Sequence, residues 1–520
     1  MSRPRIPRWL ALAAVTAVGA VGACANLVNV ERRTAAPAEV ATLDQRSPWL
    51  KAHLRDGTVL ILSAWRHDSL TREIVGTGQR QDVNRVVVDS GTLRLPVDSV
   101  ALFETNVLSP SDAHSAITVM TGLSAAVTTY CALNPKACFG SCPTFYVTDA
   151  AGTALMAEGF SSSIAPALEA TDLDALWTAH ATSRDFTVRM TNEALETHVV
   201  RSVTVVAVPR AAGARIIADD AGVFHSATAL VPPRACTADG ADCLAALSAY
   251  DLAVHSSRAD STDLGTRELV ELEFPAPGDG DVGVIVSTRQ TLMSTFLFYQ
   301  ALAWLGTNAT PWLARLTPDR IAAGSGEAGL GAILGRVDVL VEDRHGHWVA
   351  AGTVGETGPL ATDTKIVVLP RSVAADAPLR VRIRSTRGMW RLDQVQLAKV
   401  APAADAIRLD PVAVTSAGRP DARALALLLD ATQPLVTFPG DDYELQYRLP
   451  GDPADLELFL EARGYYLEWM RQEWLAEEDP AKAARLFLDP RGALRELAPV
   501  YARQEAGMDS IFWGSRYVRR

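Results

Sequence analysis

The sequence predicts a mainly β protein of the α+β class, built from several small antiparallel β modules, one of them sandwich-like, with an α-helical C-terminal region. Short β-branched runs are broken by Asp-Gly and Ser-Gly turns through most of the chain, and many of these runs alternate apolar with polar residues. Residues 451–520 instead carry apolar residues at steps of three and four. The length of 520 residues favours about three domains.

The composition is that of a folded, acidic protein. Hydrophobic residues make up 48% and charged residues 21%, which excludes a disordered or fibrous chain. The 49 basic and 60 acidic residues give a net charge of -11. This balance argues against binding by phosphate neutralisation, so no nucleic acid is expected as a partner.

The N-terminus reads as a secretory signal peptide. Residues 1–8 include three arginines and no acid, residues 9–22 are apolar, and Ala23 and Cys24 follow. The apolar run is 14 residues long, shorter than the roughly 20 that a membrane-spanning helix needs. We therefore expect cleavage after residue 23.

The four residues Val21-Gly22-Ala23-Cys24 resemble the lipobox of bacterial lipoproteins. The resemblance implies lipidation of Cys24 and, because Ala25 is not Asp, an outer-membrane location with the body facing the periplasm or the surface. An uncleaved anchor and an ordinary signal peptide with an incidental cysteine are the alternatives. Residues 24–48 are expected to form a flexible tether, because 34–42 are mostly small and include proline.

Export to an oxidising compartment favours disulfides among the other five cysteines. Cys236 and Cys243 flank a turn-rich hexapeptide that can bring them together, so we predict that they pair. We also predict a bond between Cys138 and Cys142, with Cys131 as the alternative partner of either.

Residues 138–159 resemble a small exported β-domain family of unknown function, through the pattern Cys-Phe-Gly-Ser-Cys-Pro-Thr-Phe-Tyr and a following Asp149 and Gly152. The resemblance implies a local β-hairpin and no activity. A redox site would favour the spacing C-x-x-C. A zinc site needs four ligands, and the nearest histidines downstream are His180 and His198.

The rest of the chain divides at changes of pattern. Residues 49–110 contain strand runs separated by turns, and 111–130 have small apolar residues at helical spacing. Residues 289–306 form the most apolar internal segment and predict a buried helix capped by Gly306. The predicted parts are a β-meander (49–110), a cysteine-hairpin α/β module (111–184), a second β-rich domain (185–330), a β-sandwich-like domain (331–450) and a helical C-terminal region (451–520).

Within the sandwich-like part, residues 332–400 resemble a jelly-roll-like β-sandwich, and 387–393 are similar to the C-terminal β-regions of large exported tetratricopeptide proteins. In the helical part, 455–478 predict an amphipathic helix, and Asp479-Pro480 predicts a stop followed by two further helical segments. The aromatic residues of this region favour packing over a partner surface.

No catalytic residue, metal site or cofactor is predicted. Ser325 lies between two glycines without the strand-to-helix context of a hydrolase elbow, and phosphate-binding loops are missing from the sequence. His345 and His347 are interpreted as solvated loop residues. The pairs Asp279 with Asp281 and Asp441 with Asp442 lack EF-hand spacing and are interpreted as turn carboxylates, with calcium binding as the alternative.

These observations predict a membrane-anchored envelope lipoprotein that binds a partner or helps assembly without catalysis. The expected partners are the membrane, through the N-terminal lipid, and an envelope protein or glycan. A glycan or peptide hydrolase is the first alternative, because two carboxylates distant in sequence can form a catalytic pair in space. A structural spacer protein is the second.

Overall fold

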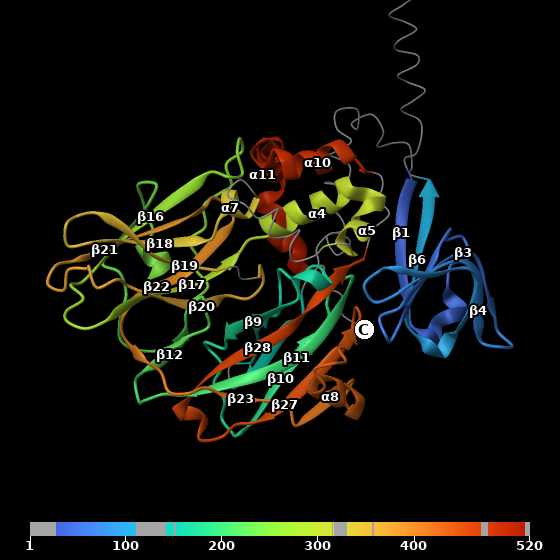
Figure 1. Ribbon diagram of the computed structural model, residues 1–520, viewed down its shortest axis with the longest axis horizontal. Helices are drawn as coiled ribbons and strands as arrows, with labels where there is room; N and C mark the ends of the chain where they lie inside the picture. The colour runs from blue at the N-terminus through green and yellow to red at the C-terminus, as the bar shows by residue number, and fades with distance from the viewer. Residues whose placement is uncertain are drawn as a thin grey trace, which may run out of the picture. The chain divides into compact units, whose positions relative to one another are not determined.

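The computed structural model describes residues 28–110, 142–149, 152–314, 316, 330–355, 358–469 and 477–514. These residues form two compact units (Figure 1). Unit 1 holds residues 28–83 and 87–110, and unit 2 holds residues 84–86 and the described residues from 142 onward. Both units are mainly antiparallel β-sheet, which confirms the predicted fold class.

Unit 1 is a single six-stranded sheet, sheet A, in the order β1-β6-β2-β3-β4-β5. Its core is formed by apolar side chains such as Leu50, Leu62 and Phe103, which are fully buried. The bounds are β1 Val28–Ala35, β2 Leu50–Leu54, β3 Val59–Asp68, β4 Glu73–Gln81, β5 Val87–Pro96 and β6 Val100–Pro110, with short 3-10 helices η1 Pro37–Thr42 and η2 Val97–Ser99.

Residues 28–48 of the predicted tether are folded, so the prediction that they are flexible is wrong. Strand β1 pairs with β6 from Val28 opposite Pro110 to Ala35 opposite Phe103. Leu43 is 7% exposed and packs in the core of sheet A. The small side chains of this segment suggest a stalk. The segment is ordered because its backbone forms the hydrogen bonds of an edge strand and because one leucine is buried.

Unit 2 contains four further sheets. Sheet B has the order β25-β24-β27-β10-β7-β8, and sheet C has the order β23-β11-β28-β9, with β26 also paired to β11. The bounds in sheet B are β7 Thr144–Asp149, β8 Gly152–Glu158, β10 Asp185–Thr191, β24 Ala413–Ser416, β25 Arg419–Pro420 and β27 Asp442–Arg448; those in sheet C are β9 Ala170–Ala175, β11 Glu196–Pro209, β23 Ile407–Leu409, β26 Leu435–Thr437 and β28 Leu456–Glu468.

Sheet D has the order β12-β13-β22-β17-β20, and sheet E has the order β15-β14-β16-β21-β18-β19. The bounds in sheet D are β12 Arg215–Ala218, β13 Phe224–Val231, β17 Val282–Gln290, β20 Asp363–Val368 and β22 Trp390–Pro402; those in sheet E are β14 Ala235–Ala238, β15 Ala241–Asp242, β16 Arg267–Phe274, β18 Val337–Glu342, β19 Trp348–Val354 and β21 Leu379–Thr386.

The four sheets pack in the order B, C, D, E. One core cluster joins B to C, a second joins C to D, and a third joins D to E together with the helices. Successive residues of sheet C alternate between two cores: Leu458 and Leu460 face sheet B, and Phe459 between them packs with residues of sheet D. Strands of the predicted parts 185–330 and 331–450 share sheets D and E, so the boundary at 330 does not separate compact units.

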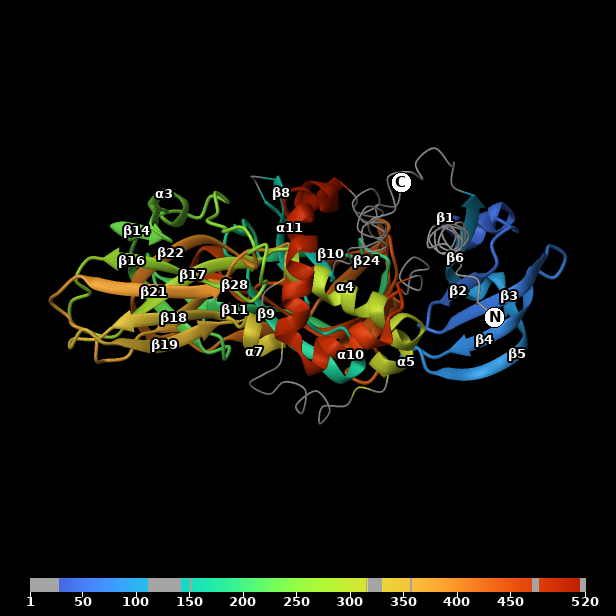
Figure 2. The same ribbon diagram turned by 90° about the horizontal axis from the view of Figure 1, so that it is seen from above.

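The helices of unit 2 include a group that packs together beside the sheets, formed by α4, α5, α10 and α11 (Figures 1 and 2). The bounds are η5 Pro166–Leu168, α3 Leu244–Leu247, α4 Met293–Leu305, η6 Gly306–Asn308, α5 Ala309–Ala314, α7 Leu330–Leu334, α8 Ala422–Leu429, η7 Pro453–Asp455, α10 Pro480–Leu488 and α11 Pro490–Gly514. Among the described residues, no helix has both the length and the apolar character needed to span a membrane.

Two helix predictions are confirmed. Helix α4 lies within the predicted buried segment and ends at Gly306, whose φ of 53° is a conformation that glycine adopts at little cost. Helix α10 begins at Pro480, and the Asp479 side chain accepts hydrogen bonds from the Ala481 and Lys482 amides at 3.1 and 3.0 Å. The helical C-terminal region thus begins at Pro480.

The predicted amphipathic helix at 455–478 is wrong, because its first half is strand β28. This strand lies between β11 and β9 in sheet C and has almost all of its side chains buried. A strand buried on both faces carries a nearly continuous apolar run, which contains apolar residues at every spacing, including three and four. Gly464 within it is also a poor helix residue.

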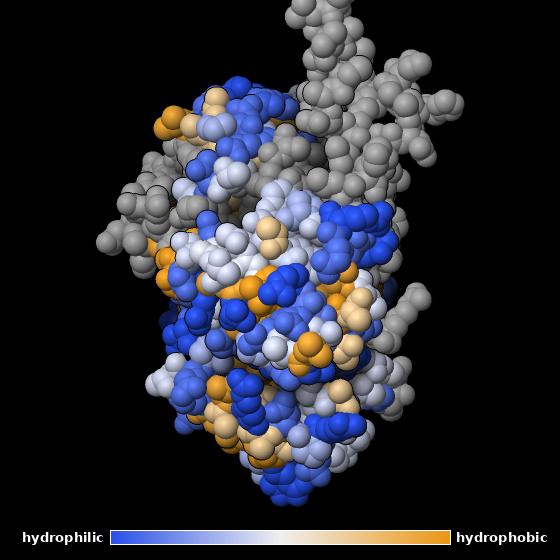
Figure 3. Space-filling model, turned by 90° about the vertical axis from the view of Figure 1, so that its right-hand side faces the viewer, coloured by the Kyte–Doolittle hydropathy of each residue, from blue (hydrophilic) through white to orange (hydrophobic). Residues whose placement is uncertain are grey.

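The surface drawn in Figure 3 mixes hydrophobic and hydrophilic residues, with the hydrophobic ones in small groups separated by hydrophilic ones. Isolated exposed apolar residues such as Leu70 and Leu488 are ordinary features of folded proteins.

Candidate functional site

Some of the cysteines lie within the described residues, and others lie outside them. Cys24, Cys131 and Cys138 lie outside it, so lipidation at Cys24 stays a prediction. Cys236 and Cys243 form the disulfide bond expected between them. Strands β14 and β15 meet within this loop, and Asp239 and Gly240 at their turn have φ values of 49° and 82°.

Cys142 carries a free thiol, which disagrees with its predicted bond to Cys138. It is 5% exposed and packs beside Phe145 and Met156 in the core between sheets B and C. Strands β7 and β8 form the expected hairpin, with Asp149 opposite Gly152. Burial raises the pKa of the Cys142 thiol well above its ordinary value, so the neutral thiol is the stable form.

The two histidines and Asp279, Asp281 and Asp441 lie in turns or loops, whereas Asp442 is the first residue of β27. The backbone amides of His345 and His347 both donate to Asp343 Oδ1 in the turn between β18 and β19. Asp281 pairs with Arg371 at 3.1 Å and Asp442 with Arg189 at 2.6 Å.

Of the other two aspartates, Asp279 lies in the turn before β17, and the Asp441 side chain accepts from the Phe438 amide at 2.8 Å. Within the described part of the chain, no group of three or more His, Cys, Asp and Glu side chains is placed to hold a metal ion.

A large cavity of unit 2 lies along α4 and is mainly apolar. Its volume is about 610 Å³, within the roughly 300–1,000 Å³ of pockets that hold small molecules. Helix α4 supplies one wall, with α7 and the start of β22 also lining it. The lining residues include Leu297, Ala301, Leu302, Leu305, Trp312, Leu330, Leu334, Met389, Trp390 and Leu486. We call this space the apolar cavity.

A smaller cavity of about 190 Å³ adjoins the apolar cavity, and four residues line both: Ile164, Gln290, Ser294 and Phe298. We call this space the polar chamber, because most of its lining residues carry a hydroxyl, thiol, amide or carboxyl group. Its other lining residues are Cys142, Glu158, Ser161, Ser162, Thr295, Tyr299, Gly358, Pro359 and Tyr466. The shared residues make the two spaces neighbouring parts of one site.

Gln290 occupies the boundary between the two spaces. It is the last residue of β17 and is 3% exposed. Its backbone amide donates to the Gly358 carbonyl, but its side-chain amide makes no hydrogen bond with any described residue. Because Gln290 lines both spaces, its side-chain amide can offer a donor and an acceptor to a ligand there.

Glu158 places a carboxyl group in the wall of the chamber. It ends strand β8, is 3% exposed, and accepts a hydrogen bond from the Leu360 amide at 2.8 Å. Burial raises the pKa of Glu158 to about 7, although the Leu360 and Ala361 amides oppose this rise. The carboxyl is therefore close to half protonated near neutral pH.

Two tyrosines close the chamber on the side of sheet C. Tyr299 of α4 donates to Glu468, and Tyr466 of β28 donates to the Ser161 carbonyl at 3.2 Å. Burial raises the pKa of Tyr466 well above its ordinary value, so its hydroxyl keeps its proton. These hydrogen bonds tie α4 and the 161–162 loop to the end of β28.

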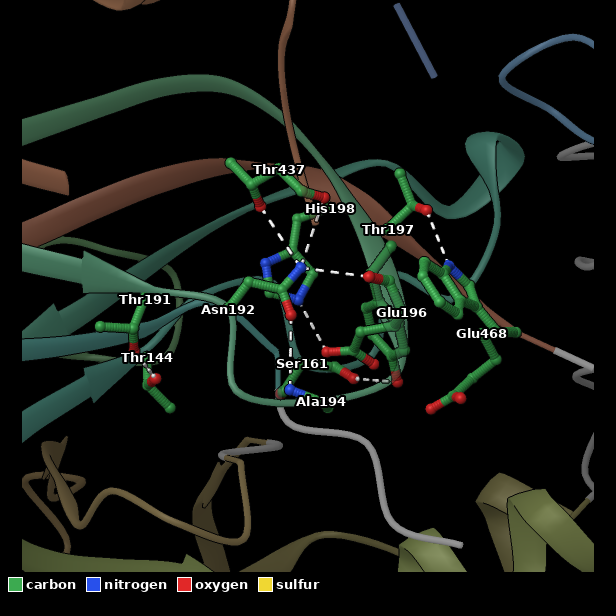
Figure 4. Close-up of polar contacts among 12 residues, drawn as sticks. Thr144, Ser161, Thr191, Asn192, Ala194, Glu196, Thr197, His198, Thr437 and Glu468 are labelled. Carbon is green, nitrogen blue, oxygen red and sulfur yellow. Dashed lines mark hydrogen bonds and ion pairs between the residues drawn. The ribbon is translucent and has the colours of Figure 1, made fainter. Parts of the chain in front are cut away.

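A buried polar network lies behind this wall (Figure 4). Glu196 Oε1 lies 2.7 Å from His198 Nε2 on β11, and both residues are 0% exposed. Register places His198 opposite Tyr466 and Glu196 opposite Glu468. The Asn192 side chain donates to the Glu196 carbonyl at 3.1 Å. Since cross-strand partners share a face, the network and the chamber lie at the same end of sheet C.

The opposite face of β11 is anchored separately. Thr197, between Glu196 and His198, accepts a hydrogen bond from the Trp469 indole at 2.9 Å (Figure 4). The start of β11 is thus held on both faces.

A second acidic group lies below the 161–162 loop, between β9 and β20. The Ser161 amide donates to Asp172 at 3.2 Å, and Asp363 pairs with Lys365 at 3.0 Å. Burial raises the pKa of Asp172 to about 6 and that of Asp174 well above its ordinary value. These groups support the chamber floor and do not line it.

Sequence reasoning found one wall of the site and missed its polar residues. The apolar run at 289–306 identifies α4. Gln290 lies near the start of this run and was not assigned a role. Glu158 lies within residues 138–159, whose resemblance implies a hairpin and no activity. Strand β28, which supplies Tyr466, was expected to be helical, so its alignment with His198 could not be foreseen.

Comparisons with known proteins do not identify a family for this chain. No protein-family model matches the sequence, and no curated protein matches it. Uncharacterized protein lmo2446 from Listeria monocytogenes EGD-e has 9% identity and a TM-score of 0.15, covering 68% of this chain and 29% of that chain. The VP2 subviral particle of infectious bursal disease virus has 10% identity and a TM-score of 0.16, covering 73% of this chain and 88% of that chain. The secreted serine protease VesC from Vibrio cholerae has 10% identity and a TM-score of 0.13, covering 72% of this chain and 99% of that chain.

Proposed function

We propose that this protein is an envelope lipoprotein that binds a small amphipathic ligand in unit 2 without transforming it. The apolar cavity receives the apolar part of the ligand, and the polar chamber receives its polar end. The protein or glycan partner expected from the sequence is replaced in this proposal by a ligand small enough to enter the cavity.

One observation carries the binding proposal: the apolar cavity adjoins the polar chamber at the unpaired amide of Gln290. Apolar walls favour an alkyl chain or a similar group, because each buried CH₂ is worth about 0.8 kcal/mol. Gln290, Ser294 and Glu158 offer hydrogen-bonding groups at the neighbouring end. Such a division of one site into apolar and polar parts fits an amphipathic molecule.

The envelope location is supported by residues 1–24 and is tested separately. We expect the full-length protein to partition into membranes and to carry a lipid-sized mass increase at Cys24. The Cys24→Ser variant is expected to lose both properties. A wild-type protein without added mass, or a variant that keeps it, would remove the lipoprotein part of the proposal and leave the cavity unaffected.

The ligand proposal is tested with 1-alkanols whose chain ends in bromine, which quenches tryptophan fluorescence at short range. Trp312 and Trp390 line the apolar cavity and serve as reporters. Saturable quenching is expected, and the affinity should rise about fourfold for each added CH₂ until the chain fills the cavity. Non-saturable quenching, or no dependence on chain length, would contradict the proposal.

Two substitutions are designed to fill the apolar cavity, and a matched substitution elsewhere serves as the control. Ala301→Phe adds volume on the α4 wall. Gly331→Phe adds volume at α7, where a Cβ atom would meet no atom within 4 Å. Both should lose binding while keeping the thermal unfolding of the wild type. Ala426→Phe makes the same change at an exposed position of α8 and should bind normally.

A hydrolase remains the second candidate, favoured by Glu158. A carboxyl group with a pKa near 7 in a cavity wall can act as a general acid. Turnover of a glycan or peptide from the cell wall that Glu158→Gln abolishes would favour this candidate. Binding without turnover would favour the first.

A further inference from the structure

The polar chamber carries an acidic group, Glu158, that makes no ion pair with any described residue. Glu158 is the one charged side chain among the described residues that line it; the others are neutral hydroxyl, thiol, amide and apolar groups. A charge in a buried wall without a partner is unfavourable. The chamber is therefore electrostatically suited to a ligand of opposite charge.

No cation of the described chain fills this role. The cation that influences Glu158 most is Arg289, which lowers its pKa by electrostatic attraction. Arg289 directs Nη1 to the Pro359 carbonyl at 2.8 Å, and the described residues show no ion pair between Arg289 and Glu158. Asp172 acts in the opposite direction and adds further negative potential. Glu158 keeps its position through the Leu360 amide, which leaves the carboxyl available to a ligand.

We propose that the polar chamber is a head-group subsite for a primary ammonium, and that the ligand is a single-chain cationic amphiphile whose chain lies in the apolar cavity and whose nitrogen contacts Glu158. This inference rests on the proposed function and specifies its ligand class.

The acceptors of the chamber match the donors of an ammonium group. An ammonium has three N–H donors and no acceptor. Glu158 supplies a carboxylate, Gln290 an amide oxygen without another partner, and Ser294 a hydroxyl at the passage to the apolar cavity. A carboxylate or phosphate head would instead place a second negative charge beside Glu158, and no cationic side chain is among the described residues that line the chamber.

The size of the chamber favours a compact head. Its volume of about 190 Å³ is less than a third of the 610 Å³ of the apolar cavity. A small ammonium group satisfies both the limited space and the charge. The longer part of the ligand then belongs in the apolar cavity.

Three probes with the same twelve-carbon chain test the inference on the full-length protein: 1-aminododecane, 1-dodecanol and dodecanoate. Each competes with 12-bromo-1-dodecanol for quenching of tryptophan fluorescence. At pH 8 the alkylammonium stays protonated and Glu158, with a pKa of about 7, is mostly ionised. We expect the ammonium to bind about tenfold more tightly than the alcohol, and dodecanoate to bind most weakly.

Glu158→Gln should remove the preference for the ammonium over 1-dodecanol. Glu273→Gln serves as the matched control, because Glu273 is exposed on β16 and its replacement changes the net charge equally. This control should keep the preference, which separates recognition at Glu158 from general attraction of amines to an acidic protein.

The outcomes separate this inference from the proposed function. Equal binding of the three probes to the wild type overturns the ammonium subsite and leaves amphiphile binding in place. A preference that survives in Glu158→Gln overturns it as well. If none of the probes displaces the brominated alcohol and the alcohol itself does not bind saturably, the proposed function fails.

Discussion

Replacing Glu158 with glutamine should make the folded protein more stable at alkaline pH and change little at acidic pH. Glutamine keeps the shape of the side chain and an oxygen that can accept the Leu360 amide hydrogen bond. It removes the ionisation that burial disfavours. The pKa of Glu158 is raised from 4.5 to about 7 in the folded state.

The sign and size of the effect follow from this difference. Below pH 4.5 both the folded and the unfolded protein carry the proton on Glu158, so the free energy of unfolding is unaffected. Between 4.5 and about 7 the unfolded chain loses the proton and the folded protein keeps it, so stability falls as pH rises. Each pKa unit corresponds to about 1.36 kcal/mol, which gives a total loss of about 3 kcal/mol above pH 7.

Urea denaturation of the wild type and of Glu158→Gln at pH 5, 6, 7 and 8 measures this directly. The free energy of unfolding of the variant minus that of the wild type should rise by about 2–3 kcal/mol across the series. Taking this difference cancels most contributions of other titrating groups, such as Asp172. A difference that stays constant across the series would refute the assigned environment of the Glu158 carboxyl.

Three further predictions concern the body of unit 2. In alkylation followed by peptide mapping, Cys142 should be modified only after denaturation, because it is 5% exposed and burial raises its pKa; modification of the native protein would contradict its placement. Replacing both Cys236 and Cys243 with serine should lower the free energy of unfolding by about 2–3 kcal/mol, since the bond closes a loop with a sequence separation of 7. Phe459→Ala should lower it by about 3–5 kcal/mol, because Phe459 is fully buried against Phe224 at 4.8 Å between ring centroids; a loss below 1 kcal/mol in denaturant titration would dispute the packing of sheets C and D.

The sequence was a good guide where local chemistry decides the structure. Alternating runs and turns identified most strands of sheets D and E, and Asp479 with Pro480 marked the start of α10. The glycine at 306 ended α4 because the chain there adopts a positive φ. These features depend on neighbours in sequence, so a single sequence contains them.

The sequence was a poor guide where packing between distant segments decides the structure. Strand β28 is central in sheet C only because sheets B and D cover its two faces, and nothing within 456–468 indicates those sheets. Cys142 stays a thiol because its side chain enters the core between sheets B and C. The edge strand β1 forms because β6 lies beside it.

The candidate site was missed for the same reason. Its polar residues come from the end of β8, the end of β17, the start of α4 and the end of β28. Each is unremarkable in its own segment, and together they form a site because four distant segments converge. The apolar wall was partly foreseen, since α4 is apolar on all sides and such a helix must be covered.

Photo-crosslinking with a twelve-carbon alcohol that carries a diazirine on its chain would test the binding of an amphiphile in the apolar cavity most directly. After irradiation of the full-length protein and peptide mapping, we predict labelled peptides from α4 and from the start of β22 around Trp390. Labelling at these peptides should disappear in Ala301→Phe and persist in Ala426→Phe. Labelling confined to exposed apolar residues such as Leu429 and Leu488, or unchanged in Ala301→Phe, would contradict the account.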